Sequence, residues 1–414
     1  MSKKILVLGI GQNNFLSFLY SKLKSFDNTF IISAPFAREL NKDVKNDSWM
    51  YDNNLVSNKP SFLSILQSFF LILIDKHTYQ TFFFILLVEK KFKKSVHFLY
   101  AQIKAKAFFL TNNNFNDFDV FHFHFLQYSY LRELFLIPKD KKIVCTFWGS
   151  DLLRTSDILN FYFVKKALSR ANIITCQSLE LKEIILSKYG RHLSDKIRIV
   201  VFPVDEKIYN DIDSARDNKD LISDFKIKYG YSSSKRNILI GHNGSVFNNH
   251  LKIIEAFNSI HHKSEVHLIV NLNYALDNDN RLSYKNKLVK QLEQTGISFT
   301  LLETFFSKEE LAISRLASDI FIHMPISDAL SGTMTEMLYA NNVVITGSWL
   351  PYKTFKTMGL YYHEADDFES LSDKIDELNS GFDNEKLKAF GNKKAIKEYF
   401  FSDKIIENWA TILN

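Results

Sequence analysis

The chain has 414 residues, more than a single hydrophobic core normally serves, so we expect two domains of about 200 residues each. Hydrophobic residues make up 46% of the chain and charged residues 24%, a balance that excludes disordered and fibrous proteins. The net charge of +6 is too diffuse to indicate a nucleic-acid partner. Both cysteines, Cys145 and Cys176, lie in apolar runs, which favours buried thiols in a reducing, cytoplasmic setting.

The first half of the chain alternates short apolar runs with longer helical segments. The apolar run at 5–11 ends in glycines rather than at a cleavage site, so we expect a first strand at 4–9 and not a signal peptide. Further strands are expected at 29–34, 119–125, 142–148, 172–176 and 197–202. Helices between strands are typical of a parallel sheet, so residues 1–210 are expected to form a Rossmann-like, doubly wound domain.

Between residues 61 and 110, apolar blocks alternate with lysine-rich blocks. Asp75, Lys76 and His77 interrupt the apolar run before it reaches the roughly 20 residues that a transmembrane helix needs, so we expect no membrane span. Two interpretations remain open. The segment is either an amphipathic surface that contacts anionic lipid at the inner face of the cytoplasmic membrane, or a set of core helices whose lysines face water.

Residues 211–235 are strongly charged, and we expect a linker there. After it, strands are expected to begin at residue 237 and to follow at 265–272, 298–303, 319–324 and 342–347, with helices at 249–260, 281–295, 307–317 and 333–341. This second series predicts another Rossmann-like domain over 236–395. The last helix, within 393–413, is expected to pack back on the first domain, so that 396–414 belongs with it.

The most informative polar segment runs from Asp328 to Glu336, directly after an expected strand and into an expected helix. Ligands of open parallel sheets bind beyond the carboxyl ends of the strands. Ser331, Gly332 and Thr333 lie at the helix start, where unpaired backbone N–H groups favour a diphosphate and the two hydroxyls add donors. Glu336, one turn into the helix, could accept hydrogen bonds from ribose. Alternatively, Ser331 is only a cap and Glu336 only complements the helix dipole.

In the first domain, His122 and His124 alternate along one strand and should face the same side. His124, nearer the carboxyl end, is the preferred general base or sugar ligand, and a buried structural histidine is the alternative. Asp151 is either a helix cap or a carboxylate that faces the acceptor. Trp148 and the two glycines Gly9 and Gly11 are also expected on the acceptor side.

Several of these segments resemble glycosyltransferase family four, and they occur in the same order as in that family. The acid, seven residues and glutamate of 328–336 resemble its donor-site signature. Two matches lie in the expected first domain: DVFHFHF is similar to the family's strand ending in His-x-His, and KIVCTFWGSDLL is similar to its strand followed by a Gly-Ser-Asp turn. Two more follow along the chain: NIITCQSLELKEIIL resembles the family's strand, serine and helix, and IRIVVFPVDEKIYN resembles its domain junction. The matches cover about 119–347. They imply that Asp328, one methylene shorter than the usual glutamate, reaches a sugar hydroxyl.

One loop departs from that family, because His242 stands where its phosphate-binding arginine is expected. The loop instead resembles that of the lipid-linked 4-acetamido-4,6-dideoxygalactose transferases, with a turn at Gly244 and Ser245 and the pair Asn249 and His250. Gly244 would permit close backbone approach to the donor, although an Asn-Gly pair is equally a plain turn. Because the two families differ in stereochemistry, retention and inversion both stay open.

Together the resemblances imply a GT-B glycosyltransferase, with two Rossmann-like domains facing a central cleft. They imply transfer from a nucleotide-sugar donor to a glycan or lipid-linked glycan in bacterial surface polysaccharide assembly. No cluster of His, Cys or carboxylate residues has the spacing of metal ligands, so we expect neither metal nor cofactor, with Lys252, Lys308 or Arg281 helping at the diphosphate. The alternatives are an epimerase, a polyol-phosphate transferase, or a catalytically silent protein that binds nucleotide sugar.

Overall fold

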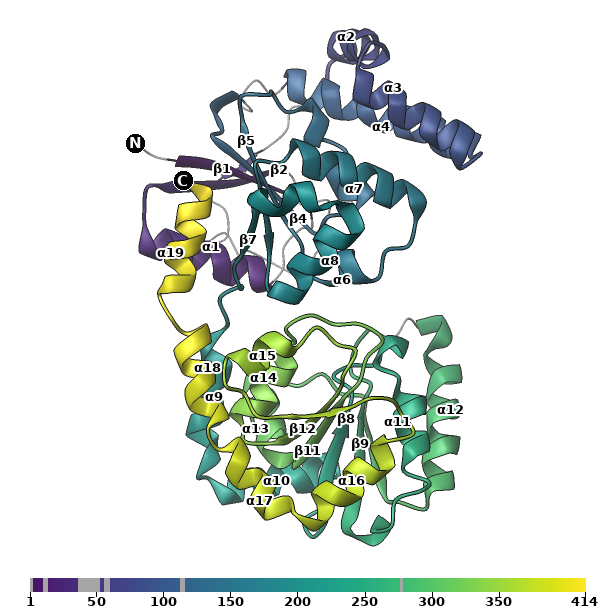
Figure 1. Cartoon of the computed structure of the whole chain (residues 1–414), viewed down its shortest axis with the longest axis vertical. Coiled ribbons are helices and arrows are strands. Elements are labelled where there is room, and N and C mark those ends of the chain that lie inside the picture. The colour runs from purple at the N-terminus through teal and green to yellow at the C-terminus, as the bar shows by residue number, and fades with distance from the viewer. Residues whose placement is uncertain (1–2, 10–13, 36–52, 56–59, 112–115, 276–277) are drawn as a thin grey trace. The chain divides into compact units, whose positions relative to one another are not determined.

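The computed structural model describes residues 3–9, 14–35, 53–55, 60–111, 116–275 and 278–414 (Figure 1). The chain divides into two compact units. Unit 1 comprises Met1–Pro203 together with Asp403–Asn414, and unit 2 comprises Val204–Ser402.

Unit 1 is built on a seven-stranded parallel sheet of order β3-β2-β1-β4-β5-β6-β7. Its strands are β1 (Lys3–Gly9), β2 (Phe30–Pro35), β3 (Asn53–Leu55), β4 (Val120–His124), β5 (Lys142–Thr146), β6 (Ile173–Cys176) and β7 (Ile197–Ile199). Every residue of the central β4 is buried, because helices cover both faces of the sheet. The helices beside the sheet are α1 (Asn14–Phe26), α5 (Tyr128–Leu131), α6 (Ser150–Leu153), α7 (Ile158–Arg170), α8 (Leu179–Tyr189) and α19 (Lys404–Leu413).

A further group of helices projects from unit 1, and it contains the apolar and lysine-rich segment of the sequence (Figure 1). It comprises α2 (Phe62–Leu73), α3 (Lys76–Phe83), the π-helical turn η1 (Phe84–Val88) and α4 (Phe92–Thr111). Asp75, one of the residues that interrupt the apolar run, caps α3 by accepting a hydrogen bond from the Thr78 N–H at 2.7 Å. The polar interruption therefore separates two helices.

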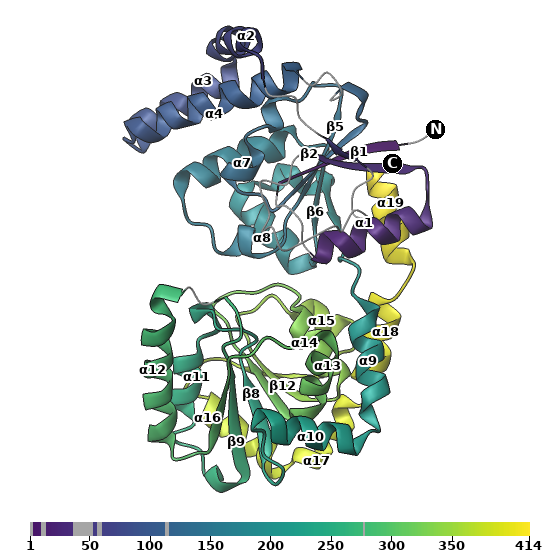
Figure 2. The same ribbon diagram turned by 180° about the vertical axis from the view of Figure 1, so that it is seen from behind.

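Unit 2 repeats the architecture with a six-stranded parallel sheet of order β10-β9-β8-β11-β12-β13 (Figure 2). Its strands are β8 (Arg236–Ile240), β9 (Val266–Asn271), β10 (Phe299–Leu302), β11 (Ile320–His323), β12 (Val343–Gly347) and β13 (His363–Ala365). Its helices are α9 (Glu206–Arg216), α10 (Lys219–Tyr229), α11 (His250–Ala256), α12 (Asn278–Thr295), α13 (Lys308–Ala317), α14 (Gly332–Tyr339), α15 (Lys353–Thr357), α16 (Leu371–Ser380), α17 (Phe382–Ala389) and α18 (Asn392–Phe400). The prediction of two doubly wound α/β domains is confirmed.

The structure differs from the sequence expectations in two segments. Residues 211–235, expected to be a linker, lie mostly in α9 and α10, because Ile208, Ile212 and Phe225 supply a buried apolar side that the high charge density hides. The expected last helix is broken after Phe400. Its two parts pack in different units, since α18 contacts α14 of unit 2 and α19 contacts α1 of unit 1.

Candidate active site

Hydrogen bonds join the two histidines of β4 into one buried network in unit 1. His122 and His124 have no exposed surface. The hydroxyl of Tyr20 on α1 lies 3.0 Å from His122 Nδ1 and 2.8 Å from His124 Nε2. At the two ends, His122 Nε2 lies 2.7 Å from Thr146 Oγ1, and Trp148 Nε1 donates to His124 Nδ1 over 3.3 Å.

The direction of these hydrogen bonds follows from Trp148, whose indole nitrogen can only donate. His124 Nδ1 is therefore the acceptor, so the neutral ring carries its proton on Nε2 and donates it to Tyr20. Burial lowers the pKa of His122 to about 3, and burial together with His122 holds the pKa of His124 well below its ordinary value. Both rings are therefore neutral at pH 7. The lone pair on His124 Nδ1 accepts the long hydrogen bond from Trp148 Nε1.

Asp151 connects two loops at the carboxyl edge of this sheet. Its Oδ1 accepts hydrogen bonds from the backbone N–H groups of Trp148 (2.9 Å) and Gly149 (3.0 Å), and its Oδ2 accepts one from Leu126 (2.7 Å). The side chain is fully buried, and burial raises its pKa to about 6 against the effect of these donors. Gly149, not Asp151, is the N-cap of α6. In this geometry Asp151 positions the loops and does not face solvent.

The residues expected on the acceptor side do not lie together: one lies in the sheet, one lies outside the described residues, and one is partly exposed. Gly9 ends β1 with a φ of 101°, and a Cβ at this position would lie 2.0 Å from the carbonyl oxygen of His124. Glycine is therefore needed for β1 and β4 to pair along their full length. Gly11 lies outside the described residues. Trp148 is partly exposed and covers His124.

In unit 2, the loop between β8 and α11 is held by internal hydrogen bonds. Gly241 has a φ of 67°, and a Cβ there would lie 2.5 Å from His250 Nε2, so close approach requires glycine at this position. The Gly244 N–H donates to the carbonyl oxygen of Tyr274 at 2.8 Å. Ser245 caps a short 3₁₀ turn that follows. The backbone N–H that we expected to approach the donor is thus bonded within the protein.

Asn249 and His250 stabilise the same loop from two sides. Asn249 adopts a left-handed conformation with a φ of 56°, and its Nδ2 donates to the carbonyl oxygen of Met324 at 2.8 Å, beyond β11. His250 is fully buried, and its Nδ1 lies 3.0 Å from the Tyr284 hydroxyl. Burial lowers the pKa of His250 to about 4. His250 therefore supports the loop from inside the protein.

Asp328 belongs to a polar cluster at the carboxyl end of β11. Its Oδ2 lies 2.9 Å from His323 Nε2 and accepts a hydrogen bond from the Tyr352 hydroxyl at 3.0 Å. The ring of His242 lies 5.3 Å from that of His323, centroid to centroid. Burial acts to raise the pKa of Asp328, but the hydrogen bond and charge of His323, with His242, hold it below the ordinary value. Asp328 is therefore a carboxylate at pH 7, and 23% of its side chain is exposed.

The loop after Asp328 leads into α14 with an open first turn. Ser331 is the N-cap, as one interpretation expected, and its Oγ accepts a hydrogen bond from the Met334 N–H at 3.3 Å. Gly332 and Thr333 are the first two helical residues, so their N–H groups have no partner within the helix. A Cβ on Gly332 would meet no atom within 4 Å. The start of α14 thus has room for an acceptor atom of a ligand.

Glu336 forms an ion pair with Arg315 of α13. Arg315 Nε and Nη2 lie 3.0 Å and 2.8 Å from the same oxygen, Oε2 of Glu336. The arginine side chain is only 5% exposed, whereas that of the glutamate is 18% exposed. Arg315 therefore orients the carboxylate from its buried side.

Sequence reasoning missed four residues of these clusters: Tyr20, Arg315, His323 and Tyr352. His323 had a usable signal, because it is the last residue of β11 and so occupies the same strand position that singled out His124 on β4. Tyr20 and Arg315 lie on helices far from the residues they bind in sequence, and no local pattern marks them.

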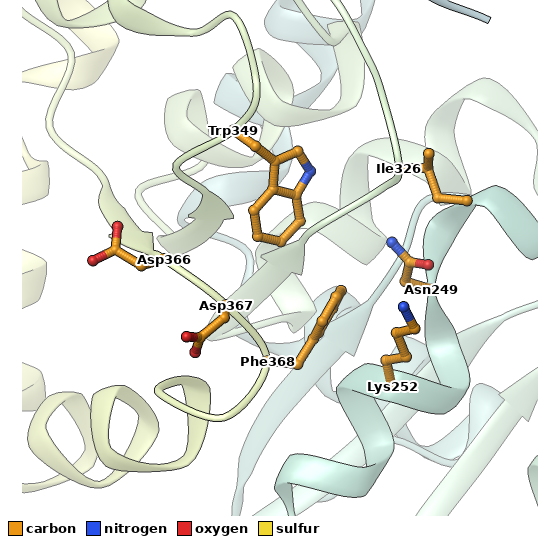
Figure 3. A pocket seen from close by; sticks show the side chains of 7 residues that line it. All are labelled: Asn249, Lys252, Ile326, Trp349, Asp366, Asp367 and Phe368. Atoms are coloured by element: carbon orange, nitrogen blue, oxygen red, sulfur yellow. The ribbon is translucent and has the colours of Figure 1, made fainter.

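A pocket of about 270 Å³ opens beside the carboxyl edge of the unit 2 sheet (Figure 3). The rings of Trp349 and Phe368 lie 5.5 Å apart, and Lys252 Nζ lies 5.4 Å from the centroid of Phe368. Ligand pockets usually span about 300–1,000 Å³, so this pocket lies just below that range. Its lining residues are Asn249, Lys252, Ile326, Trp349, Asp366, Asp367 and Phe368.

The described part of the chain contains no group of three or more His, Cys, Asp or Glu residues arranged to hold a metal ion. No protein-family model matches the chain, and no functionally curated protein matches it in sequence.

Solved structures do match. A glycosyltransferase from Rickettsia africae ESF-5 has a TM-score of 0.67 at 16% identity, with 100% of this chain and 98% of that chain covered. Anabaena Alr3699/HepE in complex with UDP and glucose has a TM-score of 0.67 at 13% identity, covering 100% and 99%. Sucrose-phosphate synthase from Thermosynechococcus elongatus has a TM-score of 0.68 at 12% identity, covering 100% and 98%. This chain has the GT-B fold. The GT-B prediction is thereby confirmed, while the finer likeness to family four and to the lipid-linked transferases stays a prediction.

Proposed function

We propose that this GT-B chain is a glycosyltransferase that moves a sugar from a nucleotide-sugar donor to a glycan or lipid-linked glycan. One observation carries the proposal: the segment of unit 2 from the β11–α14 loop into α14 combines an ionised Asp328, an open helix start at Gly332 and an oriented Glu336. These are the groups that would bind a sugar hydroxyl, a diphosphate and a ribose, and they follow one another along one short segment of the chain. The solved complex of a GT-B neighbour with UDP and glucose supports the same ligand class.

On the donor side, the start of α14 would neutralise part of the diphosphate charge through the N–H groups of Gly332 and Thr333 and the hydroxyl of Thr333. Glu336 would accept hydrogen bonds from ribose, and Arg315 would act as its positioning residue. No step of this proposal uses a metal ion, so the helix N–H groups carry the stabilisation of the leaving diphosphate.

On the acceptor side, a hydroxyl oxygen would bond to C1 of the sugar while the bond from C1 to the diphosphate breaks, and the acceptor proton would pass to a base. Of the three residues proposed for catalysis, His122 and Asp151 have their acceptor atoms occupied by short hydrogen bonds. Only His124 has a lone pair, on Nδ1, that accepts a long hydrogen bond, 3.3 Å from Trp148 Nε1. We therefore favour His124 as the base, acting once Trp148 has moved away.

The setting we propose is assembly of a bacterial surface polysaccharide such as capsule, O-antigen or lipooligosaccharide, at the inner face of the cytoplasmic membrane. A lipid-linked acceptor would be presented there. Excluding water from the bound donor would suppress hydrolysis, the competing reaction.

The test is a thermal-shift panel of UDP, GDP, TDP, CDP and CMP, because a ligand that binds only the folded state raises its apparent stability. One nucleoside diphosphate should raise Tm, and Glu336→Gln should weaken that shift, whereas Glu364→Gln, at a partly exposed carboxylate on β13 that pairs with Lys356, should not. The proposal would be abandoned if none of the five nucleotides shifted Tm.

A second function, a catalytically silent protein that binds nucleotide sugar, is favoured by one feature, the histidine at 242 in place of the phosphate-binding arginine. Slow hydrolysis of the matching nucleotide sugar, measured without acceptor, separates the two. Release of free sugar that His124→Gln abolishes supports the enzyme. Tight binding with no release from any donor supports the silent protein.

A further inference from the structure

We propose that the exposed apolar side chains of α2, of the end of η1 and of the start of α4 form a docking surface that inserts into an anionic lipid bilayer. We call it the lipid-docking face. Six of its large apolar side chains are between 61% and 81% exposed: Phe62, Leu63, Phe70, Ile74, Leu87 and Phe92. Monomeric soluble proteins rarely expose contiguous apolar surface beyond a few hundred Å², and larger areas mark interaction sites.

The helices of this face bury small polar residues while they leave large apolar ones exposed, and each also buries one large apolar residue, Ile72 on α2 and Phe98 on α4. On α2, Ser68 is fully buried, whereas Phe69 and Phe70 are 40% and 61% exposed. On α4, Ser95 is fully buried, whereas Phe92 is 66% exposed. Both serine hydroxyls bond to carbonyl oxygens of their own helices, Ser68 at 2.6 Å and Ser95 at 2.7 Å. Small satisfied polar residues inside and large apolar ones outside are what helices adopt when their surroundings are lipid.

Charge identifies the kind of bilayer. Residues 61–110 contain seven lysines and two acids. The two acids are engaged locally, since Asp75 caps α3 and Glu89 pairs with Lys94 at 2.9 Å. Lys90, Lys91 and Lys93 are exposed beside η1. A basic border around an apolar face complements anionic headgroups, because lysines near the surface are attracted to the negative potential of such a bilayer.

The dimensions favour a helix lying in the interface. Within the described residues no single helix is long and apolar enough to cross a membrane; α2 and the α3–η1 pair pass together by length and composition, but they are bent by 71°. The 12 residues of α2 span about 18 Å, less than the roughly 30 Å hydrocarbon layer. We therefore infer a helix parallel to the surface, with its apolar side in the acyl boundary.

The inference rests on the proposed function only for the purpose of docking, since a lipid-linked acceptor is located at a membrane. A second copy of this chain is the rival occupant. The basic border argues against it, because two like-charged faces repel.

The experiment is co-sedimentation of the full chain with vesicles of phosphatidylcholine alone or with 30% phosphatidylglycerol, at low and high salt. The variant is Phe62→Ser with Phe70→Ser. The matched control is Phe390→Ser, at a residue of unit 2 that is 76% exposed and distant in sequence from this face. The nucleoside diphosphate thermal shift is measured on the same samples.

We expect binding to anionic vesicles that is at least tenfold weaker on neutral vesicles, weakens with salt, and falls at least tenfold in the double variant but not in the control. No sedimentation with any vesicle, or binding unaffected by the double variant, overturns the inference. A dimer in solution that the double variant dissociates, without vesicle binding, assigns the face to a second copy instead. Vesicle binding without any nucleotide shift leaves this inference standing and removes the proposed function.

Discussion

At the scale of single residues, Arg315 determines the geometry of the candidate donor loop. A buried guanidinium needs a partner, and Glu336 provides one oxygen at two short distances. The carboxylate proposed to bind ribose is therefore the same group that compensates the buried charge of Arg315. A residue outside the loop thus fixes an orientation that the loop sequence alone does not contain.

Replacing Arg315 with Met should lower the free energy of unfolding of unit 2 by roughly 3 kcal/mol, because it leaves the partly buried Glu336 without its partner. Urea unfolding followed by circular dichroism measures the change. The control is Arg191→Met, at an exposed pair with Glu183 whose side chains are 77% and 53% exposed, where a change below about 0.5 kcal/mol is expected. Equal effects of the two substitutions would contradict the role assigned to Arg315.

At the scale of elements, most strands and helices follow from periodicity, and their ends follow from caps. Helix α13 begins with a capping box in which the Ser307 side chain accepts from the Glu310 N–H at 3.1 Å and Glu310 accepts from the Ser307 N–H at 3.0 Å. Arg315 lies on this helix. The capping box that stabilises the start of α13 therefore also helps to fix the position of Arg315.

Ser307→Ala should destabilise unit 2 by about 1 kcal/mol, the usual cost of losing a side-chain cap. Thermal or urea unfolding detects such a change. Ser370→Ala is the matched control, since Ser370 is the N-cap of α16 but makes no side-chain cap hydrogen bond there. If Ser307→Ala and Ser370→Ala cost the same, the capping box does not stabilise α13.

At the scale of the whole molecule, the last helix of the chain completes the first unit. Trp409 of α19 is fully buried, and its Nε1 donates to the carbonyl oxygen of Val201 at 2.9 Å. Its ring lies 5.6 Å from that of His122, centroid to centroid. Residues at the far end of the sequence therefore pack against the histidine network of β4.

Trp409→Ala should destabilise unit 1 by about 3–5 kcal/mol through the cavity it leaves, while unit 2 keeps its stability. Hydrogen exchange can read the two units separately, because α13 and β4 report on different units. Trp349→Ala, at a side chain 39% exposed in unit 2, is the control. Loss of protection in α13 as well as β4 would show that the two units do not unfold independently.

Stability should also fall as pH drops through the ordinary histidine range. His122, His124 and His250 are fully buried and their pKa values are lowered by burial, so the folded state stays neutral while the unfolded state takes up protons below about 6.5. The unfolded state then binds more protons, so each histidine removes about 1.4 kcal/mol between pH 7.5 and 5.5. Urea unfolding at these two pH values should show that His250→Gln loses less unfolding free energy than the wild type between pH 7.5 and 5.5, by one such increment.

The sequence by itself determined the two parallel α/β sheets, because apolar runs with helical spacing between them leave few other ways to bury their surfaces. It also located the polar residues at strand ends, including His124 and Asp328. Tertiary structure decided which of them are exposed. Asp151 and His250 are fully buried, whereas Asp328 is partly exposed. Burial and long-range partners such as Tyr20 and Arg315 depend on packing between helices and strands far apart in the chain, and no local pattern encodes that packing.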